Sequence, residues 1–134
     1  PPTRRSAVSA EVPFSEIHFT VEFEVPPAFL DRFCELAARL TDATRSDEPG
    51  TLVYQWFWNQ DRNRVVVREL FRDTAAVLAH FEAPTFQACL PELVAGASVV
   101  RFEVYGDAGP EILDGLATFG VSHYRPWLGL CRVE

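Results

Sequence analysis

Residues 47–87, DEPGTLVYQWFWNQDRNRVVVRELFRDTAAVLAHFEAPTFQ, contain the pattern that decides the fold. A Glu-Pro-Gly turn comes first, and the apolar segment Thr51–Trp58 that follows it predicts a strand. The polar segment 59–63 predicts a hairpin, and Arg64–Phe71 predicts its second strand. Both strands are apolar on both faces, so we expect helices to cover one face and a second subunit or an enclosed ligand to meet the other.

The flanking residues extend this pattern on both sides. Apolar and polar residues alternate from Glu16 to Val25, which predicts a strand, and apolar residues recur at helical spacing from Phe29 to about Thr41. Asp73 can cap a helix from Thr74 to about Phe81. The further elements that we expect are a short helical turn from Pro84 through Leu90 that Pro91 interrupts, a strand over Ser98–Tyr105, a linker over 106–109, a short helix over Pro110–Phe119 and a partly extended tail over Val121–Val133.

The predicted order is β-α-β-β-α-β followed by a helix and a strand. This order predicts an α+β, ferredoxin-like fold, in which one antiparallel sheet carries helices on a single face. We expect a flexible tail over residues 1–13, a ferredoxin-like domain over 14–106, and an extension over 107–134 that packs on the same domain or on a dimer partner. The first strand ought to be central, and its second face, His-Thr-Glu-Glu, suits a cavity that contains some polar groups.

Composition excludes several classes of function. The 134 residues suffice for one domain, and the net charge of −7 argues against nucleic acid or an anionic membrane as a partner. No apolar run reaches the roughly 18–20 residues of a membrane span, and residues 1–13 lack the apolar core of a signal peptide. We interpret Cys34, Cys89 and Cys131 as buried free thiols of a cytoplasmic protein. The sequence shows no metal-binding His/Cys cluster, phosphate loop or Ser-His-Asp order.

Several short motifs occur in a familiar order over about residues 16–105. They are Glu48-Pro49-Gly50, Leu52 and Tyr54, Glu69 and Phe71, Asp73, Ala75-Ala76, His80, Pro84 and Phe86-Gln87. In this order the chain resembles the antibiotic biosynthesis monooxygenase family, whose members are dimeric α+β barrels. The resemblance implies a homodimer in which two sheets face each other, and a pocket that each subunit keeps between its sheet and helices or at the barrel interior.

The resemblance also implies a range of activities. Several relatives oxidise polycyclic phenols with molecular oxygen and need no metal or flavin, others degrade haem, and others have no demonstrated chemistry. Phe71 stands where the family often has a tryptophan, and Leu90 stands where haem-degrading relatives have their iron-ligating histidine, which argues against haem degradation. Phe119-Gly120 and His123-Tyr124-Arg125-Pro126 resemble an extension of some members attached to polyketide pathways.

Two residues are candidates for acid–base catalysis. His18 titrates near neutral pH and lies on the polar face of the first strand, although it could also be an ordinary half-exposed histidine. Glu69 lies in the apolar run VVVRELF, so its buried carboxylate needs a partner, for which we consider Arg101, Arg125 or a substrate hydroxyl. The alternative, which the sequence favours over catalysis, is that Glu69 serves only in a structural ion pair.

Further side chains are candidates for substrate binding. Each has a structural alternative: a core position for the aromatic residues, a polar dimer seam for the first-strand residues, helix packing for His80 and a surface tail for the last two. The candidates are Thr20, Glu22, Tyr54, Trp56, Trp58, Phe71, His80, His123 and Tyr124.

The resemblance, together with these candidate residues, implies a cofactor-independent, monooxygenase-like enzyme that acts on an aromatic or polyketide-derived molecule in specialised biosynthesis. The mechanism would be substrate deprotonation followed by attack of oxygen on the carbanion. The partners that we expect are an apolar small molecule and a second copy of the chain, with no cofactor. The alternatives are a cyclase or isomerase that uses the same pocket without oxygen, and a non-catalytic ligand-binding protein of a biosynthetic pathway.

Overall fold

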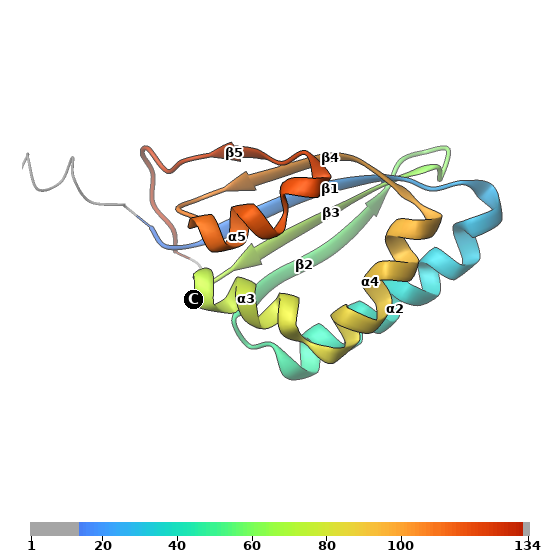
Figure 1. Cartoon of the computed structure of the whole chain (residues 1–134), viewed down its shortest axis with the longest axis horizontal. Coiled ribbons are helices and arrows are strands. Elements are labelled where there is room, and N and C mark those ends of the chain that lie inside the picture. Colours follow the sequence, from blue (N-terminus) through green and yellow to red (C-terminus); the bar gives the residue numbers. More distant parts are fainter. Residues whose placement is uncertain (1–13, 133–134) are drawn as a thin grey trace, which may run out of the picture.

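The computed structural model describes residues 14–132, and the tail predicted over residues 1–13 lies outside the described residues. The fold is the predicted ferredoxin-like α+β fold, with a sheet of strand order β2-β3-β1-β4-β5 and helices on one face (Figure 1). The sheet is open and does not close on itself. The strands are β1 (Ile17–Glu24), β2 (Thr51–Trp58), β3 (Arg64–Phe71), β4 (Ser98–Tyr105) and β5 (Ser122–Tyr124). The helices are η1 (Pro27–Phe29), α2 (Leu30–Asp47), α3 (Thr74–Glu82), α4 (Pro84–Gly96), α5 (Pro110–Gly115) and η2 (Ala117–Phe119).

Strand β1 lies at the centre of the sheet, as its alternating pattern predicts. Its apolar residues Ile17, Phe19, Val21 and Phe23 are all less than 5% exposed and face the helices. The strand pairs antiparallel with β3 on one side and with β4 on the other. The apolar side of β1 therefore forms the floor of the core, and the second, polar side faces away from the helices.

Helix α2 continues further than the predicted end near Thr41. The last turn is held because Thr44 is buried and its carbonyl accepts a hydrogen bond from the backbone N–H of Glu48 at 3.1 Å. Phe33, Leu36 and Leu40 are buried on the side of α2 that faces the sheet. This longer helix carries the chain directly into the Glu-Pro-Gly turn, where the functional site begins.

The predicted interruption at Pro91 is wrong, because α4 runs through this residue to Gly96. Proline removes one backbone N–H and disfavours a helix interior. Here Pro91 is exposed, whereas Cys89 and Leu93 on either side of it are buried. Packing of these flanking residues against the core outweighs the local preference.

The predicted extension forms α5, η2 and β5. Strand β5 pairs parallel with β4, so the sheet is mixed and not wholly antiparallel as expected. The backbone N–H of Gly106 donates to the carbonyl of Tyr124 at 2.9 Å, and a ring nitrogen of His123 lies 2.8 Å from the carbonyl of Gly106. The extension is thereby attached to the end of β4 in the same subunit.

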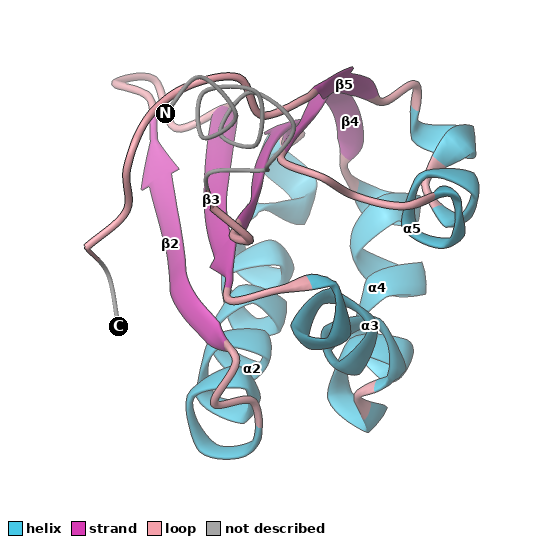
Figure 2. Ribbon diagram, turned by 90° about the vertical axis from the view of Figure 1, so that its left-hand side faces the viewer, coloured by secondary structure: helices cyan, strands magenta, loops and turns pink. Residues whose placement is uncertain are grey.

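The second face of the sheet carries no helix of the described chain (Figure 2). We call it the open face. A chain of ion pairs and hydrogen bonds crosses it, with Glu22 at its centre between Arg64 and Arg101, both at 3.1 Å. Phe57 and Val100 are 49% and 44% exposed. The open face thus combines ordered charges with exposed apolar side chains.

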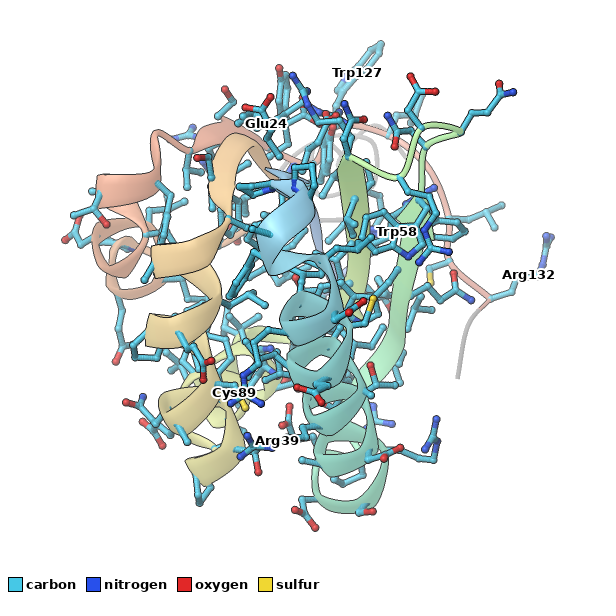
Figure 3. All side chains as sticks on the ribbon, turned by 90° about the vertical axis from the view of Figure 1, so that its right-hand side faces the viewer. Glu24, Arg39, Trp58, Cys89, Trp127 and Arg132 are labelled. Carbon is cyan, nitrogen blue, oxygen red and sulfur yellow. The ribbon has the colours of Figure 1, made fainter. Side chains whose placement is uncertain are left out.

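The C-terminal segment beyond β5 is largely exposed. Trp127 projects away from the body of the protein (Figure 3), and 86% of its surface is accessible. All three cysteines are free, but only Cys89 is buried, so the prediction of buried thiols fails for Cys34 and Cys131. Within residues 14–132, none of the helices combines the length and the apolar character that crossing a membrane requires.

Candidate functional site

A cavity of about 230 Å³ lies between the sheet and the helices, and it is partly open to solvent. Its lining is mainly apolar and includes several phenylalanine rings. The residues that line it are Phe19, Val21, Phe23, Leu40, Tyr54, Trp56, Val67, Glu69, His80, Phe81, Phe86, Gln87, Leu90, Leu93, Val94, Val99, Phe102, Gly115, Leu116 and Phe119. A mainly apolar wall with few polar groups is the usual composition of a small-molecule site.

The polar end of the cavity is a buried cluster of one histidine and two glutamates. His80 Nδ1 lies 2.6 Å from Glu48 Oε1, and His80 Nε2 lies 3.5 Å from Glu69 Oε1. All three side chains are less than 10% exposed. Glu69 and His80 line the cavity, whereas Glu48 lies behind the histidine in the wall.

Local structure explains why these three side chains meet. The Asp73 carboxylate accepts a hydrogen bond from the backbone N–H of Ala76 at 2.9 Å and so caps α3, which orients His80 toward the core two turns later. A Cβ on Gly50 would lie only 2.6 Å from the Cβ of Ala76. The glycine of the Glu-Pro-Gly turn therefore lets α3 approach closely enough for His80 to reach Glu48.

The carboxylate of Glu48 is held by more than the histidine. The hydroxyl of Thr51 donates to Glu48 Oε1 at 3.2 Å, and that of Thr44 donates to Oε2 at 3.5 Å. Burial alone would raise the pKa of Glu48, but the hydrogen bond and charge of His80, together with the two hydroxyls, lower the pKa below its ordinary value. Glu48 is therefore an anion at neutral pH.

The pKa values of the other two groups are both raised. Burial alone would lower the pKa of His80, but the hydrogen bond to Glu48 and the negative charges of both glutamates raise it. Burial raises the pKa of Glu69 to about 7, with His80 opposing the rise and Glu48 adding to it. No residue in the described part of the chain forms a hydrogen bond with the Glu69 carboxyl, so this group can exchange a proton with a molecule in the cavity.

Tyr54 stands beside this cluster, and the centre of its ring lies 5.4 Å from that of His80. Burial raises the pKa of Tyr54 well above its ordinary value, and the charges of Glu69 and Glu48 add to the effect. Its hydroxyl is consequently neutral and can donate a hydrogen bond. Both Tyr54 and Glu69 were candidates from sequence, and the fold brings them to the same end of the cavity.

The other two aromatic candidates of β2 differ in their surroundings. Trp56 lines the cavity, and its indole N–H donates to the Thr41 hydroxyl of α2 at 3.0 Å. Trp58 lies outside the cavity, in a more open groove beside α2, and the Arg62 guanidinium lies 5.0 Å from its ring centre. Of the three aromatic candidates of β2, only Tyr54 and Trp56 reach the cavity.

Three first-strand candidates lie on the open face and do not line the cavity. They are His18, Thr20 and Glu22. Our expectation that the polar face of β1 lines the cavity is not met in the described chain, because the helices pack on the apolar face and enclose the space there. Burial lowers the pKa of His18, and the positive charge of Arg68 adds to this effect while Glu16 opposes it.

The remaining candidates have structural contacts. Phe71 is fully buried behind the cavity, with its ring centre 5.1 Å from that of Phe19. His123 is bonded to the Gly106 carbonyl, and Tyr124 stacks on Tyr105 at 5.2 Å on the exposed side of the extension. These last two side chains do not line the cavity, whereas residues earlier in the extension do.

Of the partners considered for Glu69, which were Arg101, Arg125 or a substrate hydroxyl, the structure directs Arg101 elsewhere, and Glu48 was not among the candidate site residues. Arg101, a proposed partner of Glu69, bonds Glu22 and Glu103 on the open face instead. Glu48 was interpreted as part of a turn and as one of the motifs of the family resemblance, without a role in the site. The signal that could have identified it is the inward-facing His80, since a buried imidazole needs a hydrogen-bonding partner.

The cluster does not resemble a metal centre. His80 presents a different ring nitrogen to each carboxylate, so the three side chains do not converge on one point. In the part of the chain that the structure describes, no group of three His, Cys, Asp or Glu residues could hold a metal ion. The arrangement can take up and release protons at the boundary of an apolar space.

Comparison with known proteins agrees with this architecture. The family model "antibiotic biosynthesis monooxygenase" matches residues 17–92, more than half of the sequence, and the chain belongs to this family. The matched region includes the three residues of the buried cluster. No curated protein matches the chain in sequence.

Solved structures share the fold at low sequence identity. MupZ from Pseudomonas fluorescens is 24% identical with a TM-score of 0.72, and the match covers 88% of this chain and 95% of MupZ. Rv0793 from Mycobacterium tuberculosis is 20% identical with a TM-score of 0.61, over 67% of this chain and 92% of Rv0793. A candidate antibiotic biosynthesis monooxygenase from Caulobacter crescentus is 20% identical with a TM-score of 0.63, over 75% of this chain and 94% of that protein.

Proposed function

We propose that this protein is a cofactor-independent monooxygenase that acts on an aromatic or polyketide-derived small molecule, with Glu69 as the general base. The observation that carries the proposal is a buried carboxyl with no hydrogen bond from the described chain, at the polar end of an otherwise apolar cavity. Its pKa of about 7 places both protonation states within reach at neutral pH. Membership of the monooxygenase family supports the reaction type.

The reaction that fits is oxidation of an activated methylene between aromatic rings. Glu69 takes a proton from the methylene carbon, and the resulting carbanion supplies electrons to molecular oxygen as a carbon–oxygen bond forms. The peroxide then takes up a proton and loses water as the second carbon-bound hydrogen leaves. One oxygen atom remains as a carbonyl and the other departs as water, so the substrate supplies every electron and no further reductant is needed.

The cavity supplies the setting for this chemistry. Phe81 and Phe86 are stacked with ring centres 5.6 Å apart, and Phe81 also stacks on Phe19 at 6.1 Å. These surfaces suit a flat aromatic molecule. The Tyr54 hydroxyl can donate to a carbonyl or phenolate oxygen of the substrate, and a bound substrate together with the apolar lining would limit the access of water to the carbanion.

A second candidate function is a cyclase or isomerase that uses the same cavity without oxygen. The specific observation in its favour is the pKa of about 7, because a carboxyl that is half protonated at neutral pH can return a proton as readily as remove one. Such a group can move a proton between two positions of one substrate. The two functions share the residue and differ in whether oxygen is consumed.

We also propose that the functional unit is a homodimer formed through the open face. The exposed apolar residues Phe57 and Val100 on that face support the proposal, as does the family's dimeric architecture. His18 and its neighbours would then lie between two sheets. The cavity with Glu69 lies within a single subunit in either case.

The test is oxygen consumption with an anthrone-type phenol as the probe. The wild-type protein should consume oxygen and form the corresponding quinone, and Glu69→Gln should lower the rate at least about a hundredfold, the usual contribution of a general base. Glu92→Gln is the matched control, because Glu92 is an exposed carboxylate that bonds Arg32. Conversion of the probe without oxygen uptake would favour the cyclase. Saturable binding with no conversion, and an unaffected Glu69→Gln variant, would favour a binding protein.

A further inference from the structure

We infer that Glu48 is a positioning residue for the cavity carboxyl: it acts through His80, whose ring it holds in place and keeps positively charged beside Glu69. This inference rests on the proposed role of Glu69 and deepens it. Glu48 does not line the cavity and would not touch a substrate. Its influence on the chemistry has to pass through the imidazole.

The geometry makes His80 a bridge between two carboxylates. Its Nδ1 is 2.6 Å from Glu48 and its Nε2 is 3.5 Å from Glu69, so opposite edges of one ring face the two groups. The shorter contact is a charge-assisted hydrogen bond in which the Nδ1–H donates to the carboxylate. It fixes the orientation of the ring, and the second nitrogen is then directed at Glu69.

The surroundings of Glu48 fix its carboxylate in one position beside His80. Both of its oxygens receive hydroxyl donors, from Thr51 and Thr44, and its side chain is buried in the turn between α2 and β2. These bonds hold the carboxylate in one place. A purely structural ion pair would need no third group, yet Glu69 extends from β3 to within 3.5 Å of the same ring.

The charges of this cluster explain how Glu48 can influence Glu69. Glu48 and Glu69 are the charged side chains that face His80, and Tyr54 and Cys89 are the other titratable groups beside the cluster. With Glu48 in place, the pKa of the imidazole is raised, and the positive charge of its protonated form favours the carboxylate form of Glu69 in the apolar cavity. Without Glu48, a buried histidine would be neutral at the pH where Glu69 must accept a proton.

The test needs no substrate, because histidine protonation can be followed by nuclear magnetic resonance on ¹⁵N-histidine-labelled protein. The chain has three histidines, so His18→Asn and His123→Asn identify the signals. In the wild type, His80 should stay protonated above the ordinary midpoint of about 6.5. In Glu48→Gln its midpoint should fall by about 1–3 pH units. Glu92→Gln, an exposed substitution of the same kind, should leave the midpoint unchanged.

The wild-type measurement also covers the case in which Glu48→Gln does not fold. A wild-type His80 that is already neutral below about pH 6.5 would overturn the inference without any variant. An unchanged midpoint in a folded Glu48→Gln protein would overturn it as well. Glu48→Asp, which keeps the charge, should restore part of the raised midpoint.

Turnover of the anthrone-type probe separates this inference from the proposed function. Glu69→Gln should lose activity at every pH. Glu48→Gln should keep activity at high pH but need a higher pH to reach it, because Glu69 would hold its proton more tightly. A fully active Glu69→Gln removes the proposed function while the histidine titration can still support the coupling. If Glu69→Gln is inactive but the pH profile of turnover is unshifted in Glu48→Gln, the positioning role of Glu48 is refuted while the proposed function stands.

Discussion

Glu69 is an ionisable side chain that is buried beside an apolar cavity, where the carboxylate form is disfavoured. Its folded-state pKa of about 7 lies above the ordinary value of 4.5, so the folded protein favours the protonated form. Below about pH 4.5 the carboxyl is protonated in both the folded and the unfolded state, so it does not lower the folding stability. As the pH rises toward 7, the unfolded state loses this proton first and the folding stability falls. Above about pH 7 the loss of folding stability is constant. It amounts to roughly 3 kcal/mol, since each pKa unit between the unfolded and folded values corresponds to about 1.4 kcal/mol.

Glu69→Gln should therefore stabilise the protein at alkaline pH. The amide resembles the protonated carboxyl and has no charge to bury. Urea unfolding at about pH 4 and about pH 8 should show similar stability for variant and wild type at the lower pH, and an advantage of up to roughly 3 kcal/mol for the variant at the higher pH. An equal advantage at both values would mean that packing, and not ionisation, is responsible.

His18 provides a contrasting prediction on the other side of the sheet. Because it lies on the open face, His18→Ala should leave the binding of an apolar probe in the cavity within about twofold of wild type. Fluorescence titration with the neutral dye N-phenyl-1-naphthylamine measures this binding. A large loss of affinity would show that the dye occupies a second site on the open face, where the sequence had placed the chemistry.

Alternation along a strand could identify which residues share a face, but not which face the helices cover. Glu69 was recognised because a carboxylate stands in an apolar run, and Tyr54 because aromatic residues cluster in its strand, while His18 was preferred as the base although it lies opposite the cavity. Glu48 could not be recognised from spacing, because it meets His80 across a separation of 32 residues. That contact depends on how closely α3 approaches the turn at Gly50, which is a tertiary property.

At the scale of elements, the C-terminal extension forms part of the cavity wall. Leu116 and Phe119 line the cavity, and the ring of Phe119 lies 5.9 Å from that of Phe102 in β4. The family model ends at residue 92, so these side chains lie outside it. The 88% coverage in the MupZ comparison has to include part of the extension, since residues 1–106 make up a smaller share of the chain.

Phe119→Ala should weaken the binding of apolar molecules without preventing folding. The side chain is partly buried in a short 3-10 helix, and its removal opens one wall of the cavity. We expect roughly a fivefold loss of affinity for N-phenyl-1-naphthylamine, equivalent to about 1 kcal/mol of lost apolar contact. Thr118→Ala, an exposed neighbour in the same element, is the matched control. Equal binding by both variants would contradict a wall role for the extension.

The strands were predictable from alternating residues in β1 and β4, and from apolar segments bounded by turn residues in β2 and β3. Strands β2, β3 and β4 have the predicted bounds. The helix through Pro91 and the parallel strand β5 were not predictable, because packing of flanking residues decides the first and a pairing with β4 decides the second. Both outcomes depend on contacts that are distant in sequence.

At the scale of the whole molecule, the open face is the feature that a second copy would have to cover. Phe57→Asp puts a charge on an exposed apolar position of that face and should shift a dimer toward monomer, with at least a tenfold rise in the dissociation constant. Sedimentation equilibrium measures the shift. Ala38→Asp, on an exposed position of α2, is the control. A wild-type protein that is monomeric at all concentrations would refute the dimer.

The attachment of β5 to the end of β4 has a further effect on how the sheet can grow. Strand β5 is three residues long and follows only Glu103–Tyr105, while β4 has a register irregularity where it passes Glu22 and Phe23. Short and irregular edges are poor templates for a foreign strand, whereas β2 offers an edge of eight residues whose single register shift lies at its start, between Thr51 and Val53. If two molecules pair through their β2 edges, only the short and irregular edges formed by β4 and β5 remain. Further copies would then find no good template, so we expect this association to stop at a pair and not to continue into fibrils.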